Sequence, residues 1–64
     1  MPVIQATMWA GITDENKKKL VEGITKACEA IGIPADAVTV IIYEVPKKDW
    51  ATAGQLHTER FPRP

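Results

Sequence analysis

The sequence predicts an α/β fold: one β-α-β unit with parallel strands, followed by a short C-terminal hairpin or tail. Three patterns predict it, namely a strand-like run at residues 2–9, a helical apolar pattern after Thr13, and a dense β-branched run at residues 37–45. A strand, a helix and a second strand in this order call for a right-handed crossover between parallel strands. We expect residues 1–64 to form one small domain.

The first strand is predicted at residues 2–9, where β-branched, aromatic and polar residues mix, and Gly11 follows as a break. Because side chains alternate along a strand, this run has two faces. One face carries Val3, Gln5, Thr7 and Trp9, and the other carries Ile4, Ala6 and Met8.

A helix is predicted after Thr13, which has the position and chemistry of an N-cap. Asp14 and Glu15 follow in the first turn, where the helix dipole favours acidic side chains. An apolar stripe of helical period predicts one buried helix face. Its members are Leu20, Ile24, Ala27, Cys28 and Ile31, while Lys17, Lys18, Glu22 and Lys26 lie largely off it. Gly32 and Pro34 supply the stop signals.

Residues 37–45 form the strongest strand pattern of the chain, and Pro46 closes it. Their nearly continuous hydrophobicity is typical of a parallel strand that is covered on both faces. Residues 47–49 are predicted as a polar turn, Trp50 as an anchor, and residues 51–54 as a small-residue loop or short hairpin. The tail from Glu59 to Pro64 is expected to be extended and to lie across a neighbouring subunit.

Composition favours self-association over other means of stabilisation. A chain of 64 residues buries too little apolar surface to be comfortably stable alone, yet 45% of its residues are hydrophobic. Cys28 has no second cysteine to pair with, and the single histidine, His57, gives no cluster resembling a metal site. We therefore expect a homo-oligomer without a metal.

Charge and hydropathy exclude several classes of partner. Eight basic and eight acidic residues balance to a formal net charge of zero, which disfavours binding to nucleic acid or to an anionic membrane. No run approaches the roughly 18 apolar residues of a membrane span, and no basic segment followed by a long apolar stretch opens the chain. We expect a soluble, cytoplasmic protein, with which a lone cysteine agrees.

Pro2 is the principal candidate for catalysis, because removal of Met1 would leave a secondary amine at the start of the first strand. A prolyl amine has no side-chain freedom to lose, and it releases its proton more readily when it is desolvated or placed near a cation. Such an amine can act as a base near neutral pH. The alternative is that Pro2 is only a good first residue for a strand, where a missing N–H costs nothing.

Several segments, taken in order and at their spacings, resemble one known family. They are Pro2 with its strand, Gly11, the helix start TDENK at 13–17, the strand VTVIIYE at 38–44, Trp50 at the place of a family aromatic, and AGQL at 53–56. Together they resemble the 4-oxalocrotonate tautomerase family, and the resemblance covers almost the whole chain.

This resemblance implies a β-α-β subunit that pairs into a four-stranded sheet, with three pairs assembling as a homohexamer. It also implies that Pro2 is the general base of a keto-enol tautomerase, an isomerase of small 2-hydroxy-dienoates or arylpyruvate-type enols. An uncharged amine in an apolar pocket can take a proton from an enol hydroxyl and return it to carbon. The expected reaction needs neither metal nor cofactor.

The two arginines of the family site, which bind the substrate carboxylate and polarise its carbonyl, are replaced here by Ile12 and Thr39. Loss of such a clamp removes charge-assisted hydrogen bonds worth about 1.5–3 kcal/mol each. We therefore expect a phenylenolpyruvate-like enol ahead of the dianion 2-hydroxymuconate. Thr39 would offer a hydroxyl, while Trp9 and Trp50 would wall the pocket and donate indole N–H bonds, unless they are core or interface anchors.

Further residues carry weaker hypotheses. Tyr43 and His57 are candidate acids, although a strand tyrosine and a solitary histidine are ordinarily surface residues. Arg60 or Arg63 is a candidate for replacing the missing clamp in a neighbour's site. Two other functions stay open: hydration or dehalogenation of an unsaturated acid with Glu44 as water activator, and small-ligand binding without turnover.

Overall fold

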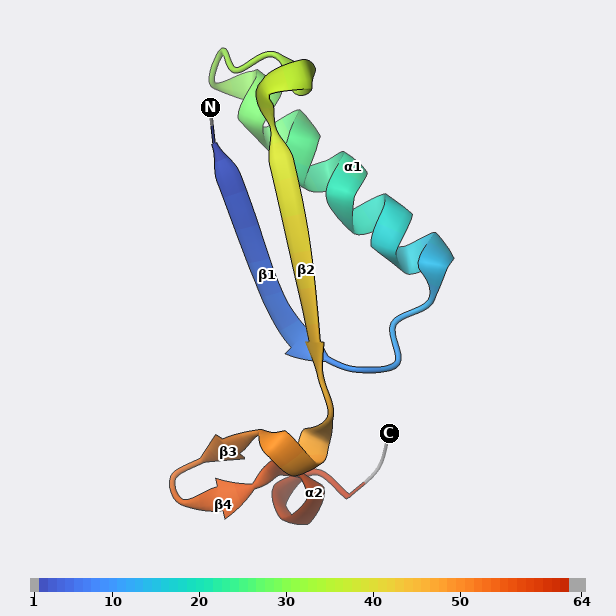
Figure 1. Ribbon diagram of the computed structural model, residues 1–64, viewed down its shortest axis with the longest axis vertical. Helices are drawn as coiled ribbons and strands as arrows, with labels where there is room; N and C mark the ends of the chain where they lie inside the picture. Colours follow the sequence, from blue (N-terminus) through green and yellow to red (C-terminus); the bar gives the residue numbers. More distant parts are fainter. Residues whose placement is uncertain (1, 63–64) are drawn as a thin grey trace.

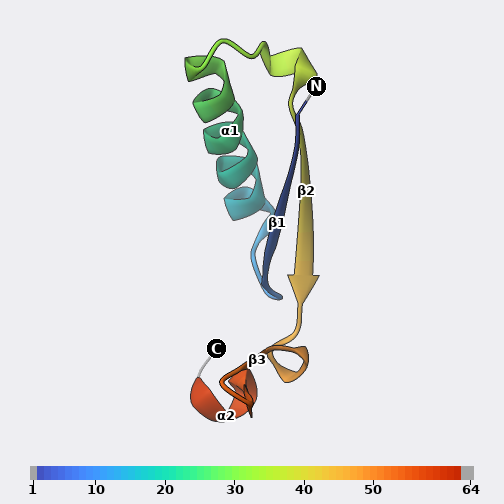
Figure 2. The same ribbon diagram turned by 90° about the vertical axis from the view of Figure 1, so that its left-hand side faces the viewer.

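A parallel pair of strands carries one long helix on a single face in the computed structural model of this chain (Figures 1 and 2). The structure describes residues 2–62. The elements are β1 (Val3–Trp9), α1 (Asp14–Ala30), the 3₁₀ turn η1 (Ala35–Ala37), β2 (Thr39–Val45), the 3₁₀ turn η2 (Lys47–Asp49), β3 (Ala51–Thr52), β4 (Gln55–Leu56) and α2 (His57–Arg60). The predicted β-α-β unit with parallel strands and a C-terminal hairpin is thereby confirmed.

The register of the two long strands fixes which residues share an end of the sheet. β1 and β2 pair along their whole length, from Val3 opposite Thr39 to Trp9 opposite Val45. At the amino end, the N–H of Thr39 donates a 3.1 Å hydrogen bond to the carbonyl oxygen of Pro2. Pro2 and Thr39 therefore lie at one end of the sheet, and Trp9 lies at the other.

Helix α1 begins and ends at the predicted signals. Thr13 is its N-cap, and the Thr13 hydroxyl accepts a hydrogen bond from the N–H of residue 16 at 3.1 Å. At the other end, Gly32 has φ of 92° and donates its N–H to the carbonyl oxygen of Glu29. The N–H of Ile33 donates to the carbonyl oxygen of Cys28, which completes a Schellman motif.

The sheet has one covered and one open face. Burial alternates along β1, where Ile4, Ala6 and Met8 are half-buried and their neighbours are exposed. In β2 the exposed residues include Ile41 and Tyr43. Figure 2 shows α1 on one side of the strands only. The prediction that the second strand is covered on both faces is therefore wrong for a single chain, because no other element between residues 2 and 62 reaches the second face.

The helix face that covers the sheet differs partly from the predicted stripe. Leu20, Ile24 and Cys28 are half-buried or buried as predicted, but Ala27 and Ile31 are exposed, Ile31 to 76%. Ile31 lies beyond the helix as its C-cap residue. Figure 1 shows α1 tilted relative to the strands. The covered side consequently shifts around the helix and takes in Lys17, Val21 and Thr25, which are also half-buried.

Two predicted boundaries need correction. β2 begins at Thr39 and not at residue 37, because a 3₁₀ turn follows Pro34 and the N–H of Ala37 donates to the Pro34 carbonyl oxygen at 2.9 Å. The tail from Glu59 onward is not wholly extended, because α2 includes residues 59 and 60 and is closed by a 2.8 Å hydrogen bond from Phe61 N–H to the carbonyl oxygen of residue 57. Residues 63–64 lie outside the described residues.

The predicted short hairpin is formed by β3 and β4, which pair as antiparallel strands. Ala53 and Gly54 connect them with φ of 55° and 77°. Positive φ at both central residues is the mark of a type I′ turn. In Figure 1 the hairpin and α2 lie beyond the carboxyl ends of β1 and β2, where they extend the molecule along its longest axis.

Candidate functional site

The predicted site residues fall into two groups at opposite ends of the sheet. Pro2 and Thr39 lie at the amino end, joined by the backbone hydrogen bond between them. Trp9 is the last residue of β1, Ile12 lies in the connection from β1 to α1, and Trp50 follows η2 at the carboxyl end. A seven-residue strand spans about 20 Å. The two groups of one chain therefore cannot contact the same small substrate.

At the amino end, Pro2 is half-buried and Thr39 is exposed. Thr39 lies opposite Val3, whose side chain is 56% exposed on the open face of the sheet. Within residues 2–62 the Thr39 hydroxyl has no hydrogen-bond partner, so it is available to a ligand. This end thus offers a prolyl nitrogen, one hydroxyl and an apolar surface.

At the carboxyl end, four rings form an aromatic cluster that consists of Trp9, Trp50, His57 and Phe61. The Nε1–H of Trp9 donates a 2.8 Å hydrogen bond to Nδ1 of His57. The His57 ring stacks on Trp50 with 5.4 Å between centroids, and it meets Trp9 and Phe61 edge to face at 5.5 and 5.2 Å. Thr52 Oγ1 lies 2.8 Å from the second ring nitrogen, Nε2. Every ring nitrogen of His57 is thereby engaged.

The expectation that His57 is a surface residue is wrong, because its side chain is only 8% exposed. Its hydrogen-bond partner Trp9 lies 48 positions earlier in the chain. No local pattern in the sequence indicates this contact, since it arises only when the hairpin folds back to the end of β1.

The indole N–H groups, which we expected to donate to a substrate, have partners within the chain. Trp9 Nε1–H donates to His57, and Trp50 Nε1–H donates to the carbonyl oxygen of Val45 at 2.9 Å. The two tryptophans can therefore offer ring surface to a ligand while these hydrogen bonds persist. Trp9 remains 37% exposed, and Trp50 is half-buried.

Two cations hold the C-terminal segment against the aromatic cluster. Lys47 Nζ lies 4.4 Å from the centroid of the Trp9 ring and donates a 2.6 Å hydrogen bond to the carbonyl oxygen of Phe61. Arg60 Nη1 donates to the Thr52 carbonyl oxygen at 3.3 Å and to Gln55 Oε1 at 3.4 Å. Arg60 thus contacts its own hairpin, and Arg63, the other predicted clamp, lies outside the described residues.

Glu44 takes part in a polar link between β2 and α1. Its Oε2 lies 2.9 Å from Lys17 Nζ, and its Oε1 accepts a 3.2 Å hydrogen bond from the N–H of Gly11. The hydrogen bond from Lys17 is the main cause that lowers the pKa of Glu44, and the Gly11 N–H adds to it. Glu44 pairs with Met8 near the carboxyl end of the sheet, away from Pro2. This arrangement fits a structural role better than activation of a water beside Pro2.

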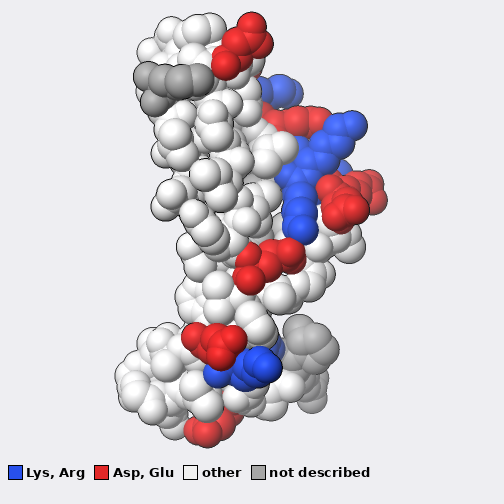
Figure 3. All heavy atoms as spheres, viewed as in Figure 1, with Lys and Arg blue, Asp and Glu red and all other residues white. Residues whose placement is uncertain are grey.

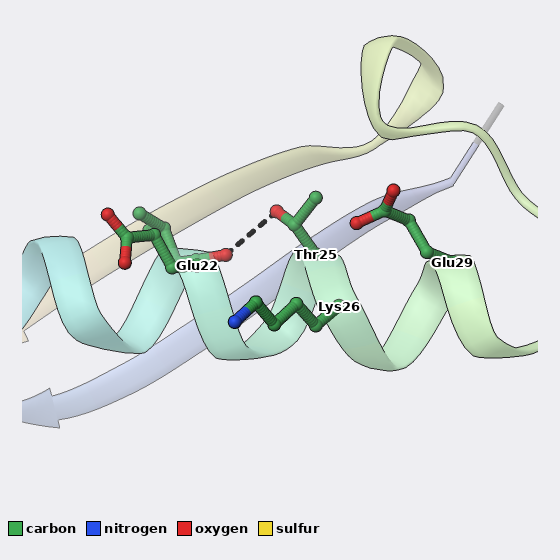
Figure 4. Close-up of a pocket in the computed structure, with 5 residues that line it drawn as sticks. Glu22, Thr25, Lys26 and Glu29 are labelled. Atoms are coloured by element: carbon green, nitrogen blue, oxygen red, sulfur yellow. Dashed lines mark hydrogen bonds between the residues drawn. The ribbon is translucent and has the colours of Figure 1, made fainter.

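A surface hollow lies elsewhere. It has a volume of about 280 Å³ and is lined by Val21, Glu22, Thr25, Lys26 and Glu29. Figure 4 shows that these residues all come from α1, with the Thr25 hydroxyl bonded to the Val21 carbonyl oxygen of the same helix. A hollow with one helix as its wall contains none of the predicted site residues.

Tyr43, the remaining candidate acid, is 46% exposed on the open face of the sheet.

Between residues 2 and 62, no group of three histidine, cysteine or carboxylate side chains is placed to hold a metal ion. None of the helices described here has the length and apolar character needed to cross a membrane.

One family model and several curated proteins match most of this chain. The family model described as "Tautomerase enzyme" matches residues 2–60. A 2-hydroxymuconate tautomerase of Comamonas testosteroni is 44% identical over 55 residues, which cover 84% of this chain and 87% of that protein. A probable tautomerase of Ralstonia nicotianae is 46% identical over 55 residues, which cover 84% of this chain and 79% of that protein.

Solved structures share the fold over nearly the whole length. A 4-oxalocrotonate tautomerase homologue of the tomaymycin biosynthetic pathway superimposes with a TM-score of 0.89 at 33% identity, over 97% of both chains. A heterohexamer 4-oxalocrotonate tautomerase from Chloroflexus aurantiacus gives a TM-score of 0.84 at 32% identity, over 92% of this chain and 97% of that chain. The projecting hairpin is thus part of a recurring subunit shape.

Proposed function

The chain belongs to the tautomerase family, and on that premise we propose that it is a keto-enol tautomerase whose general base is Pro2, freed by removal of Met1. The observation that carries the proposal is the place of Pro2 at the start of β1, half-buried and fixed through its carbonyl oxygen by the N–H of Thr39. A base held in this way has a defined position relative to the sheet. Its ring nitrogen takes no part in the strand ladder and is free for chemistry.

In the proposed reaction, the Pro2 amine removes the proton of an enol hydroxyl and delivers it to the carbon that becomes saturated in the keto product. The proton and the π electrons move within one substrate, so the chemistry balances without an added oxidant or cofactor. The half-buried setting of Pro2 limits competing exchange of that proton with water.

The proposed substrate is a small 2-hydroxy-dienoate or an arylpyruvate-type enol. Ile12 and Thr39 supply no cation at the places where the family has arginines, while Trp9 and Trp50 supply aromatic surface. Relatives carry the name 2-hydroxymuconate tautomerase. We expect this chain to favour a substrate with one carboxylate and an aromatic or apolar remainder over the dianion, because a second unpaired carboxylate would be costly to desolvate.

We propose that the site is completed between subunits of a homohexamer. The chain exposes 4868 Å², whereas a folded monomer of its mass, 7.0 kDa, is expected to expose about 4,000 Å². Its radius of gyration is 14.7 Å, against about 11 Å for a compact domain of 64 residues. In Figure 3 the charged side chains gather over α1 and the C-terminal segment, and the surface over the strands is largely uncharged.

Association explains both the open face and the separation of the site residues. Within one chain, β1 separates Pro2 from the aromatic cluster by about 20 Å. In an oligomer, a second copy can bring its own aromatic cluster to the Pro2 end of the first copy. Cys28, buried and unpaired, would stay a free thiol in the cytoplasm, where we expect the enzyme to act.

The proposal is tested by measuring ketonisation of phenylenolpyruvate by protein whose intact mass shows loss of Met1, beside Pro2→Ala. The variant keeps an N-terminal amine but loses the ring, so we expect its kcat/KM to fall at least about 100-fold. The control is that the circular dichroism spectrum and the native mass of Pro2→Ala match those of the wild type, which shows that fold and assembly are unchanged. Equal turnover by the two proteins would overturn Pro2 as base, and absence of turnover in both would favour a binder without catalysis.

A further inference from the structure

The partners of His57 determine which of its nitrogens carries a proton. An indole nitrogen can only donate, so Trp9 Nε1–H, 2.8 Å away, requires Nδ1 of His57 to be an unprotonated acceptor. A neutral imidazole then has its proton on Nε2, which donates to Thr52 Oγ1 at 2.8 Å. Both hydrogen bonds form together in one protonation state and one tautomer of His57.

Through these contacts His57 joins three parts of the chain. It holds Trp9 of β1 by a hydrogen bond, Trp50 by stacking at 5.4 Å with 22° between planes, and Thr52 of β3 by its second nitrogen. The imidazole stacks on the Trp50 ring and meets the Trp9 ring edge to face, so it contributes to the orientation of both indoles. The hydrogen bond from Trp9 to His57 therefore links the end of β1 to α2, and the contact of His57 with Thr52 extends this link to the hairpin.

A second proton on His57 would remove the acceptor of the Trp9 hydrogen bond. It would place an N–H donor against the Trp9 N–H donor across 2.8 Å. The charged groups around the cluster are Lys47 of η2, 4.4 Å from the Trp9 ring centroid, and Arg60 of α2, which bonds the Thr52 carbonyl oxygen. Between residues 2 and 62, the ion pairs within 4.0 Å join Lys17 to Glu44 and Lys19 to Glu15, and neither pair includes His57.

We propose that His57, as a neutral imidazole with its proton on Nε2, is a positioning residue that fixes the rings of Trp9 and Trp50, and that a second proton releases them. The consequence for substrate binding rests on the proposed function, because it requires these rings to wall the substrate. The positioning itself does not depend on catalysis.

The first test is nuclear magnetic resonance of the assembled full-length protein labelled with ¹⁵N, titrated from pH 8 to pH 5. We expect the Nε2–H tautomer at pH 8 and a downfield, hydrogen-bonded Trp9 indole N–H that loses this shift as His57 gains a proton. His57→Asn, whose Oδ1 accepts near the position of Nδ1 without titrating, should keep the Trp9 signal at every pH. His57→Phe keeps a ring without an acceptor, so its Trp9 indole signal should lack the hydrogen-bond shift at every pH. Thr58→Ala is the control, because Thr58 is exposed on the same helix, and it should behave like the wild type.

The second test follows the KM and kcat for phenylenolpyruvate over the same pH range. Loss of one neutral hydrogen bond corresponds to about a three- to tenfold change, so we expect KM to rise by that factor at low pH and in His57→Phe at all pH values. His57→Asn should show a KM that does not vary with pH.

The outcomes separate the two proposals. An Nδ1–H tautomer at pH 8, or a Trp9 signal unaffected by His57→Phe, would overturn the positioning whatever the turnover. The expected spectra with no turnover in any protein would support the positioning and refute the proposed function. If the spectra are as expected but His57→Phe is active with the KM of the wild type, His57 has no role in substrate binding.

Discussion

The N–H of Thr39 donates a 3.1 Å hydrogen bond to the carbonyl oxygen of Pro2, so a residue that we propose to contact the substrate lies directly beside the candidate base. The same register places Thr39 opposite Val3 on the exposed face of the sheet. A change of charge at position 39 would therefore act close to the Pro2 end of the sheet, with little disturbance of the helix side.

Thr39→Arg should shift preference toward a dicarboxylate substrate. A guanidinium forms charge-assisted, bidentate hydrogen bonds with a carboxylate, which a threonine hydroxyl cannot match. We expect the ratio of kcat/KM for 2-hydroxymuconate to that for phenylenolpyruvate to rise about tenfold or more, which corresponds to about 1.4 kcal/mol. Thr39→Met, long but uncharged, is the control. Equal ratios for the arginine and methionine variants would contradict the prediction.

Ile41→Glu should break the assembly. Ile41 lies on the open face of the sheet, where association would bury it, and an unpaired carboxylate placed there costs several kcal/mol. At a concentration where native mass spectrometry finds the wild type at six times 7.0 kDa, we expect the variant as monomers or dimers. Ile31→Glu is the matched control, because Ile31 is 76% exposed at the end of α1. A hexameric Ile41→Glu protein would exclude this face as the interface.

The contact between Lys17 and Glu44 should make stability depend on pH at both extremes. The hydrogen bond between them lowers the pKa of Glu44 below its ordinary 4.5 and raises that of Lys17 above its ordinary 10.5. A lowered carboxyl pKa stabilises the fold above the unfolded-state pKa, and this contribution is lost as pH falls through the folded-state pKa. The raised pKa of Lys17 acts in the opposite direction. Its stabilising contribution is fully present below the unfolded-state pKa and is lost as pH rises through the folded-state pKa.

Urea unfolding of the wild type and Glu44→Gln at fixed protein concentration measures this effect. The difference in unfolding free energy between the two should be constant from pH 6 to pH 8 and shrink below pH 4.5, since glutamine keeps an acceptor for Gly11 but has no charge. Glu15→Gln is the control, because Glu15 and its partner Lys19 are exposed and 3.9 Å apart. A difference that persists unchanged at pH 3 would count against the ion pair.

The β-α-β unit could be predicted because its signals are local. Thr13 caps α1 and Gly32 ends it through backbone geometry that depends on a few neighbouring residues. Alternation along β1 indicated its two faces in the same way. The end of the buried stripe at Ile31 could not be predicted, because it depends on how α1 is tilted over the strands.

The candidate site was less predictable, because its geometry depends on contacts between distant segments. The sequence indicates Pro2 and Thr39 as site residues, but only the strand register shows that they lie side by side at one end of the sheet. His57 gives no local signal, since Trp9 reaches it across 48 positions and Thr52 reaches it through the turn of the hairpin. The burial of this lone histidine depends on the fold, and no sequence pattern around residue 57 indicates it.

Ala53→Asn should stabilise the hairpin that directly precedes His57. Ala53 has φ of 55°, a left-handed conformation that costs an ordinary L-residue about 1–2 kcal/mol and that asparagine tolerates better. With Gly54 at φ of 77°, the variant would have the Asn-Gly pair that type I′ turns prefer. We expect a gain of about 0.5–1 kcal/mol in unfolding free energy, measured by urea denaturation at fixed protein concentration.

Ala51→Asn, in strand β3, is the control for this change, because asparagine is disfavoured in strands and should give no gain there. Tryptophan fluorescence provides a local readout, since Trp9 and Trp50 both contact His57 at the base of the hairpin. A loss of stability in Ala53→Asn would mean that the turn does not need its left-handed conformation in the assembled protein.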